Sequence, residues 1–169
     1  AVLWATGGIS ASAELPGLRA AYSIQDSDLA APALEKISPW TAVPETGINH
    51  SFSPKHYYLK IELANGAKPF QGILEIPFNR LRRVDLIEKN AQGIFTVTRN
   101  GADVAMAARP LRHAAAAFRL ALAPGEKRGF YLHIASDTTI KIQLNLQSDS
   151  DFFQNHADHL IAYGIYSGL

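Results

Sequence analysis

Two runs of alternating apolar and polar residues between His56 and Phe78 constrain the fold more strongly than any other part of this sequence. Successive side chains of a β-strand point to opposite faces of a sheet, so each run has one apolar and one polar face. Asn65-Gly66 and Pro69 separate the runs and favour a turn. We therefore predict two adjacent antiparallel strands of a sandwich, each with one face in the core. The predicted core residues are Leu59, Ile61, Leu63, Leu74, Ile76 and Phe78.

Further segments along the chain show the same period of two. They are residues 19–25, 81–89, 93–99, 114–122, 127–136 and 139–146. Short strands at a spacing of about ten residues, without strong helical patterns between them, are typical of an all-β sandwich. Near the end of the chain, Ser150 is a predicted N-cap of a helix. We predict a signal-like or irregular segment over 1–18, a β-sandwich domain over 19–149 and a C-terminal helix over 150–169.

Composition excludes several classes of protein. Apolar residues make up 47% of the chain and charged residues 18%, which is too apolar for a disordered protein. The net charge is only +1 and the one tight basic group is Arg80, Arg82 and Arg83, so we predict no nucleic-acid partner. Because the chain has no cysteine, disulfide frameworks, thiolate zinc sites and thiol nucleophiles are excluded.

The first residues allow two interpretations. Ala1–Ile9 is apolar, and Ala11-Ser12-Ala13 supplies the small residues that a signal peptidase reads, although no basic segment precedes them. An ordinary first strand accounts for the same residues. No run in the sequence approaches the roughly 20 apolar residues that a membrane-spanning helix needs.

The sequence contains none of the common catalytic motifs, such as G-x-S-x-G, a Walker loop, a dinucleotide glycine fingerprint or H-E-x-x-H. We predict a protein that is not an enzyme and needs no cofactor. His156 and His159 have the spacing of a helical metal pair, but without a third ligand we predict no metal site. Glu62, Glu75 and Asp85 could imitate the paired carboxylates of a glycosidase, although a solvated strand face is the simpler interpretation.

The residues predicted to point away from the core form a more informative pattern. Aromatic rings stack on the C–H faces of sugars while polar side chains bind the hydroxyls, so a sheet face with both suits a carbohydrate. Alternatively, loops or a neighbouring subunit half-cover these residues. Trp40, in a loop with Pro39 and Pro44, is predicted to plug one end of the core. The predicted ligand-binding residues are Tyr58, Lys60, Glu75, Tyr131 and His133.

Several segments, taken in order, resemble one protein family. They include Tyr57-Tyr58-Leu59-Lys60, Leu74-Glu75-Ile76-Pro77, Val84-Asp85-Leu86, Tyr131-Leu132-His133-Ile134 and Gly164–Leu169. Together they resemble the type-two extracellular domain of bacterial receptors that join seven transmembrane helices to diverse intracellular signalling modules. The resemblance covers about Trp40–Leu169. It implies a jelly-roll sandwich similar to carbohydrate-binding modules, on the periplasmic side of the inner membrane, with a C-terminal membrane tether that is absent from this chain.

The resemblance also implies a function. Such domains are thought to sense a ligand, often presumed to be a carbohydrate, and to pass the signal to kinase- or cyclase-type modules, as in two-component systems. This sequence departs from the family pattern at Tyr58, Lys60 and His133, where the family usually has Trp, Arg and often Arg. Lysine lacks the planar fork of arginine, so bidentate contacts are not expected at Lys60.

An alternative function stays open alongside ligand sensing. The same face or the C-terminal helix could form a homodimer or contact a partner sensor domain, with no small molecule bound. We also expect His133 to be exposed near a lysine, so that binding or association responds to pH between about 5 and 7.

Overall fold

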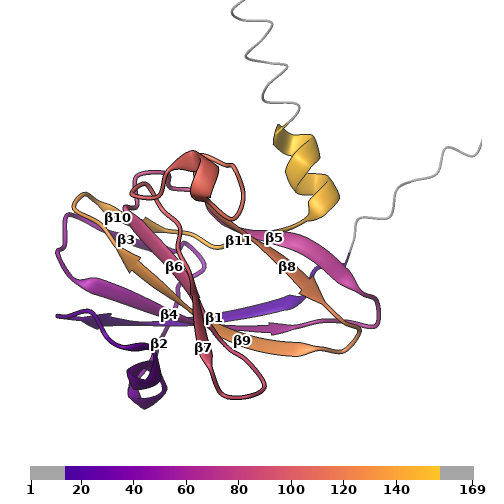
Figure 1. The fold of residues 1–169 in the computed structure, drawn as a ribbon, viewed down its shortest axis with the longest axis horizontal. Coiled ribbons are helices and arrows are strands. Elements are labelled where there is room, and N and C mark those ends of the chain that lie inside the picture. The colour runs from indigo at the N-terminus through magenta and orange to yellow at the C-terminus, as the bar shows by residue number, and fades with distance from the viewer. Residues whose placement is uncertain (1–13, 157–169) are drawn as a thin grey trace, which may run out of the picture.

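The computed structural model describes residues 14–156, which form two layers of antiparallel strands (Figure 1). One layer is a six-stranded sheet with the strand order β2-β1-β4-β9-β6-β7. Its strands are β1 (Gly17–Gln25), β2 (Thr41–Ala42), β4 (His56–Ala64), β6 (Arg83–Lys89), β7 (Phe95–Thr98) and β9 (Lys127–Ala135). The predicted all-β class is therefore confirmed.

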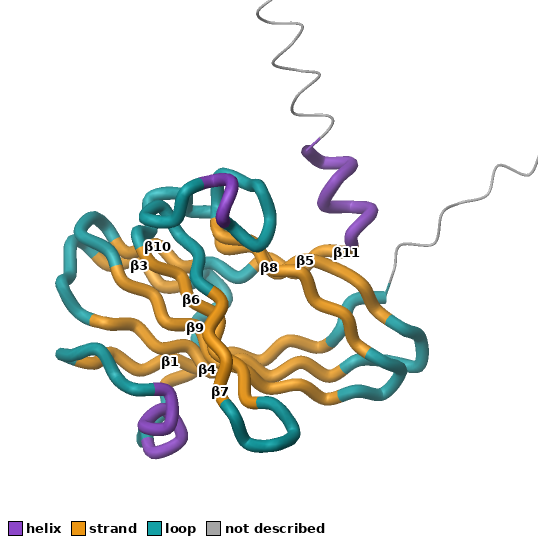
Figure 2. The backbone as a smooth tube through the Cα atoms, viewed as in Figure 1, coloured by secondary structure: helices purple, strands orange, loops and turns teal. Residues whose placement is uncertain are grey.

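Smaller sheets face the six-stranded sheet across the core (Figure 2). β10 (Ile140–Ile142) pairs with β3 (Ile48–His50), and a three-stranded sheet has the order β11-β5-β8. The three strands of that sheet are β5 (Phe70–Ile76), β8 (Ala116–Leu122) and β11 (Asn145–Ser148). Two short 3-10 helices, η1 (Ala31–Lys36) and η2 (Met106–Ala108), lie in the connections.

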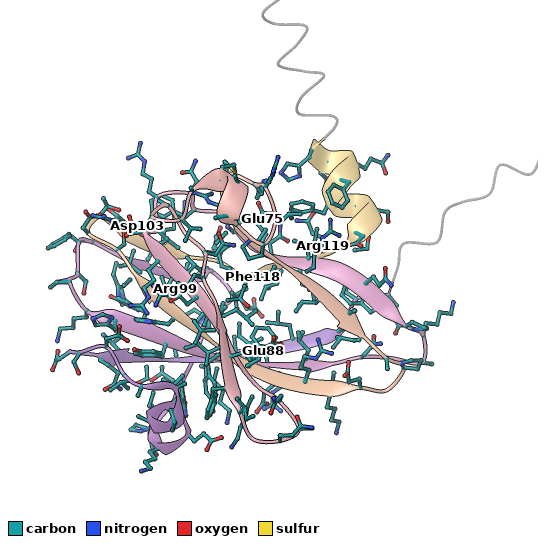
Figure 3. All side chains as sticks on the ribbon, viewed as in Figure 1. Glu75, Glu88, Arg99, Asp103, Phe118 and Arg119 are labelled. Atoms are coloured by element: carbon teal, nitrogen blue, oxygen red, sulfur yellow. The ribbon has the colours of Figure 1, made fainter. Side chains whose placement is uncertain are left out.

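The apolar faces of the strands meet between the layers. Leu59, Leu132 and Leu86 lie side by side on β4, β9 and β6. On the opposite layer, Leu74 of β5 pairs with Phe118 of β8, and Phe118 points into the space between the layers in Figure 3. These five side chains are at most 4% exposed. Burial of each such side chain stabilises the fold by about 1.5–3 kcal/mol, so the alternation accounts for the sandwich.

The strands of the opening pattern do not pair with each other, contrary to prediction. β4 lies between β1 and β9 in the large sheet, whereas β5 lies between β11 and β8 in the other layer. The physical reason is the loop after β4, which is bound to the loop between β8 and β9. Asn65 donates from Nδ2 to the carbonyl oxygens of Leu122 and Ala123 at 3.3 and 2.8 Å, and Gly125 N–H donates to Gly66 O at 2.7 Å. These bonds direct the chain across the end of the sandwich instead of into a hairpin.

The C-terminal part of the fold also differs from prediction. The segment 139–146 is not one strand, because β10 pairs with β3 and β11 pairs with β5. The helix begins at residue 149, and its N-cap is Ser148 rather than Ser150, since Asp151 N–H donates to Ser148 Oγ at 3.2 Å. Within residues 14–156, no helix has the length and apolar character needed to cross a membrane. The signal-like start and the Gly164–Leu169 segment lie outside the described residues.

Candidate functional site

The outer face of the six-stranded sheet brings together four of the five predicted ligand-binding residues. Tyr58 and His133 are directly opposite on β4 and β9, and Lys60 and Tyr131 form the next outward pair along the same strands. Directly opposite residues on one face of an antiparallel pair have Cβ atoms about 5 Å apart. The four side chains therefore form one continuous patch.

Glu75 does not belong to this patch. It lies on β5 in the opposite layer, where its strand neighbours are Ala117 and Asn145. Its side chain is almost buried and accepts a hydrogen bond from His113 Nε2 at 2.8 Å. Figure 3 shows Glu75 near the C-terminal helix, on the far side of the sandwich from the six-stranded sheet. The prediction that Glu75 lies on the same face as Lys60 is wrong, because the two outward faces of a sandwich point in opposite directions.

One half of the outer face is covered by the connection between β1 and β2, which we call the strap (residues 26–40). Leu34, at the centre of η1 in the strap, is 1% exposed and packs with Tyr58 and Ile87 in a small apolar cluster. Tyr58 itself is fully buried. Loop coverage, the alternative interpretation of the outward residues, therefore applies to Tyr58. In Figure 1, η1 projects from the side of the six-stranded sheet that faces away from β5 and β8.

The hydroxyl of Tyr58 holds the strap in place. It accepts a hydrogen bond from Leu29 N–H at 2.7 Å and donates one to Asp28 Oδ1 at 3.1 Å. Burial is the main reason that the pKa of Tyr58 rises to about 12, so the hydroxyl stays protonated. Its role in this structure is to anchor the strap rather than to face a ligand.

An arginine links the strap to the sheet beside Tyr58. Arg83 on β6 donates from Nη1 to Asp28 and from Nε to Asp85, both at 2.7 Å. Partial burial by itself raises the pKa of Asp28, but the hydrogen bond from Arg83 and nearby positive charge hold it below its usual value. Asp85 is 1% exposed, so Arg83 supplies the partner that a buried carboxylate needs.

His133 lies beneath the strap and is only 1% exposed, so the prediction of an exposed histidine is wrong. Its ring stacks on Tyr58 with centroids 4.4 Å apart, and its Nε2 is 2.8 Å from His56 Nδ1. Burial, reinforced by the charge of Arg83, lowers the pKa of His133 to about 4. The prediction that binding or association responds to pH between about 5 and 7 assumed an exposed His133 ring, and the buried ring does not support it.

Asp28, His56 and His133 form a group whose possible ligand atoms lie within 4.8 Å of one another. The guanidinium of Arg83 is already bound to Asp28. In addition, Asp28 lies 3.7 Å from Nδ1 of His133, whereas His56 faces Nε2 of the same ring. One histidine nitrogen cannot face both partners, so this group is better described as a hydrogen-bonded network than as a metal site.

The other half of the outer face is open. Lys60 has a side chain that is 42% exposed and lies 3.8 Å from Glu62 Oε1, and the half-buried Tyr131 stacks against Trp40 with centroids 6.0 Å apart. Trp40 packs on the apolar cluster of Leu34, Tyr58 and Ile87 and not at the end of the main core, so its predicted position is wrong. The open half therefore presents two aromatic rings beside a lysine and a carboxylate.

A hollow of about 520 Å³ continues this open half toward the end of the strands. Gly17 and Gly129 make it possible because they have no side chains, while Arg19, Glu62 and Lys127 stand around it. Its lining includes no residue of the opposite layer, so it lies on the outer side of the sheet. Lys60 and Tyr131 are two residues along their strands from Glu62 and Gly129, which places them at its border.

Several residues that shape this face gave little signal in the sequence. Asp28 and Leu34 act from a connection without a strand pattern, and only their pairing with distant residues reveals their role. Gly129 interrupts an otherwise regular strand pattern, and a strand glycine of this kind is a known sign of open or closely approached backbone.

The sequence of this chain matches a known protein family. No curated protein matches the chain. The family model described as 7TMR-DISM extracellular 2 matches residues 19–148, a range that includes the whole six-stranded sheet except the first two residues of β1. The chain therefore belongs to the 7TMR-DISM extracellular 2 family, the extracellular sensor domains of membrane receptors.

Proposed function

We propose that this sensor domain binds a small polar ligand of the carbohydrate class on the open half of the outer face of the six-stranded sheet. The observation that carries the proposal is the position of the hollow, which adjoins Lys60, Tyr131 and Trp40. A sugar ring resting against the aromatic pair would place its hydroxyls toward the charged residues around the hollow.

The chemistry of this half suits a neutral polar ligand. Lys60 and Glu62 supply donors and acceptors of opposite charge, and Arg19 is directly opposite Glu62 on β1. Hydroxyl groups both donate and accept hydrogen bonds, so they can bind the basic side chains and the carboxylate alike. The partly exposed rings of Tyr131 and Trp40 offer apolar surface at low entropic cost.

The buried residues beneath the strap have a supporting role in this proposal. Tyr58, first predicted to contact ligand, anchors the strap that carries Trp40, and His133 stacks on the ring of Tyr58. The location that we propose is the periplasmic side of a bacterial inner membrane, and the sandwich would resemble carbohydrate-binding modules in its use of a sheet face. No catalytic step is proposed.

A thermal-shift screen against mono- and oligosaccharides tests the proposal, followed by titration calorimetry of any sugar that raises the melting temperature. Gly129→Leu is the decisive variant, because a Cβ at Gly129 meets nothing closer than the Ile61 carbonyl oxygen at 3.8 Å. The added side chain fills the hollow without strain in the sheet. Lys60→Met removes a charge at the border of the hollow, and Lys141→Met on β10 is the matched control on the other layer.

We expect Gly129→Leu to abolish the sugar response and Lys60→Met to weaken binding at least about tenfold, the loss of one charge-assisted hydrogen bond. Lys141→Met should bind as the unmodified protein does. A sugar response that survives Gly129→Leu would place the ligand elsewhere. If no sugar binds and sedimentation shows a concentration-dependent increase in mass, the alternative of an interaction or dimerisation module is favoured.

A further inference from the structure

We propose that Glu75, His113 and His156 form a binding site for a divalent transition metal of the zinc class, on the outer side of the three-stranded sheet. The possible ligand atoms of these residues all lie within 4.8 Å of one another. They come from β5, from the loop before β8 and from the C-terminal helix, respectively. The site therefore joins parts of the chain that are far apart in sequence.

Glu75 is prepared as a ligand by its surroundings. Its side chain is almost buried, and its Oε2 accepts hydrogen bonds from Gln147 Nε2 at 3.3 Å and Asn145 Nδ2 at 3.5 Å. These amides fix the carboxylate and leave Oε1 directed toward His113. The hydrogen bond from His113 holds the pKa of Glu75 below its usual value despite partial burial, so the carboxylate is ionised at neutral pH.

His113 is held by the loop that carries it. Arg109 donates from Nη1 to the carbonyl oxygens of His113 and Ala114, both at 2.8 Å, and from Nε to Val104 O at 2.9 Å. The ring then places Nε2 2.8 Å from Glu75 Oε1. A metal ion would take the place of the proton shared by these atoms, and His113 would carry its ring proton on Nδ1.

His156 has the arrangement that metal-binding histidines commonly have. Its Nδ1 lies 2.8 Å from the carbonyl oxygen of Phe152, and because a carbonyl only accepts, Nδ1 carries the proton. In the neutral ring, Nε2 then has a free lone pair. A backbone carbonyl that fixes the tautomer in this way is a frequent outer partner of a metal ligand.

Phe152 brings the helix close enough for this geometry. It is 2% exposed and packs against the outward side chains Ile73 and Ala117 of the three-stranded sheet. As a result the rings of His113 and His156 lie with centroids 4.4 Å apart. Figure 1 shows the helix standing over the sheet formed by β5, β8 and β11.

The donor set identifies the class of metal. Two imidazoles and one carboxylate are the ligands of zinc sites that keep a fourth position open, with bonds of about 2.0–2.2 Å. Tetrahedral ligands at that distance are about 3.3 Å apart, so the pair of His113 and Glu75 needs to separate by only about half an ångström. Among the described residues, no lysine or arginine forms an ion pair with Glu75, in contrast to Asp28 with Arg83.

Metal binding at this site would fix the C-terminal helix on the sheet. Apart from the packing of Phe152, the helix is held by weaker contacts, such as a hydrogen bond of 3.2 Å from Asn155 Nδ2 to Gln147 and the Arg119 guanidinium over Phe153. A bond from the metal to His156 would add a strong contact one turn beyond Phe152. The metal would thereby control how firmly the end of this domain is docked.

The test is calorimetric titration of Zn²⁺ into the full chain, after removal of any histidine tag and dialysis against chelator. His156→Ala and Glu75→Gln remove ligands of the proposed site. His56→Ala is the matched control, since it removes a histidine from the other three-residue group. Visible absorption of the Co²⁺ complex reports the coordination geometry, and hydrogen exchange of residues 149–156 reports docking of the helix.

We expect one Zn²⁺ per chain, with affinity lowered at least tenfold in His156→Ala and Glu75→Gln and unchanged in His56→Ala. The helix amides should exchange more slowly with metal, and Co²⁺ should give the intense bands of a tetrahedral site. His156 is half-exposed and lies outside the family-matched residues, so circular dichroism should show an intact fold in His156→Ala. Absence of binding in the unmodified chain, or equal binding by all four proteins, would overturn the proposal.

Discussion

Acidification should destabilise this domain through His133, and by a predictable amount. The buried ring has a pKa of about 4 in the folded protein against 6.5 for an unperturbed histidine. Between these values the unfolded chain binds a proton that the folded chain does not, so the free energy of unfolding falls as the pH falls. The penalty is absent above about pH 7 and is complete below about pH 4.

The magnitude follows from the same two pKa values. At pH 5 the unfolded histidine is almost fully protonated and the folded one is mostly neutral, which corresponds to about 2 kcal/mol of lost stability relative to pH 7.5. For a domain of this size the melting temperature should fall by roughly 4–8 °C from this cause. The lowered pKa values of Asp28 and Glu75 act in the same direction, but mainly below their ordinary values of 3.8 and 4.5.

Urea denaturation at about pH 7.5 and pH 5.0, with and without His133→Phe, isolates the contribution of this residue. Phenylalanine keeps a ring against Tyr58, whose centroid is 4.4 Å from that of His133, but cannot take up a proton. The unmodified protein should lose about 2 kcal/mol more than the variant over this interval, because only the unmodified protein carries the buried imidazole whose pKa is lowered on folding. Equal losses in both proteins would show that His133 is not held neutral by burial.

Two further predictions concern the strands and the strap. Gly72→Ala should lower the free energy of unfolding by at least about 2 kcal/mol, because a Cβ at Gly72 collides with the Gln147 carbonyl and the Phe70 ring. Gly129→Ala should be neutral or stabilising by up to about 1 kcal/mol, because a Cβ there meets no close neighbour. Urea denaturation measures both free energies, and equal effects of the two substitutions would contradict the close contacts at Gly72. Tyr58→Phe should lower the free energy of unfolding by about 1–2 kcal/mol and speed hydrogen exchange of residues 26–40, because Leu29 N–H loses its partner. Unchanged exchange of these residues would show that the hydroxyl does not anchor the strap.

The sequence predicts the direction of side chains well, because the alternation is itself the physical requirement of a strand with one buried face. Leu59, Ile61 and Leu63 are all in the core, as are Ala116 and Phe118 despite four consecutive alanines that could have favoured a helix. Side-chain direction depends only on local geometry, so it needs no knowledge of which strands pair.

The coverage of outward residues could not be predicted in this way. Tyr58 and His133 point outward from the sheet, yet both are buried, because the strap packs over them. The contact between Tyr58 and Leu29 joins residues 29 positions apart, and its energy comes from a hydroxyl and one amide rather than from a repeated pattern. Alternation distinguishes core from non-core positions, but exposure depends on which connection crosses the sheet.

The position of Glu75 shows why pairing decides the function of an outward residue. By alternation Glu75 and Lys60 are equivalent, since each points away from the core on neighbouring segments of the chain. A hairpin between β4 and β5 would place both on one face, with one candidate site. The hydrogen bonds from Asn65 to the loop after β8 instead send β5 to the other layer, where Glu75 contacts His113 near the helix. A few backbone contacts at one loop thus divide a single apparent site into two, with aromatic and charged groups on one side and imidazole and carboxylate groups on the other.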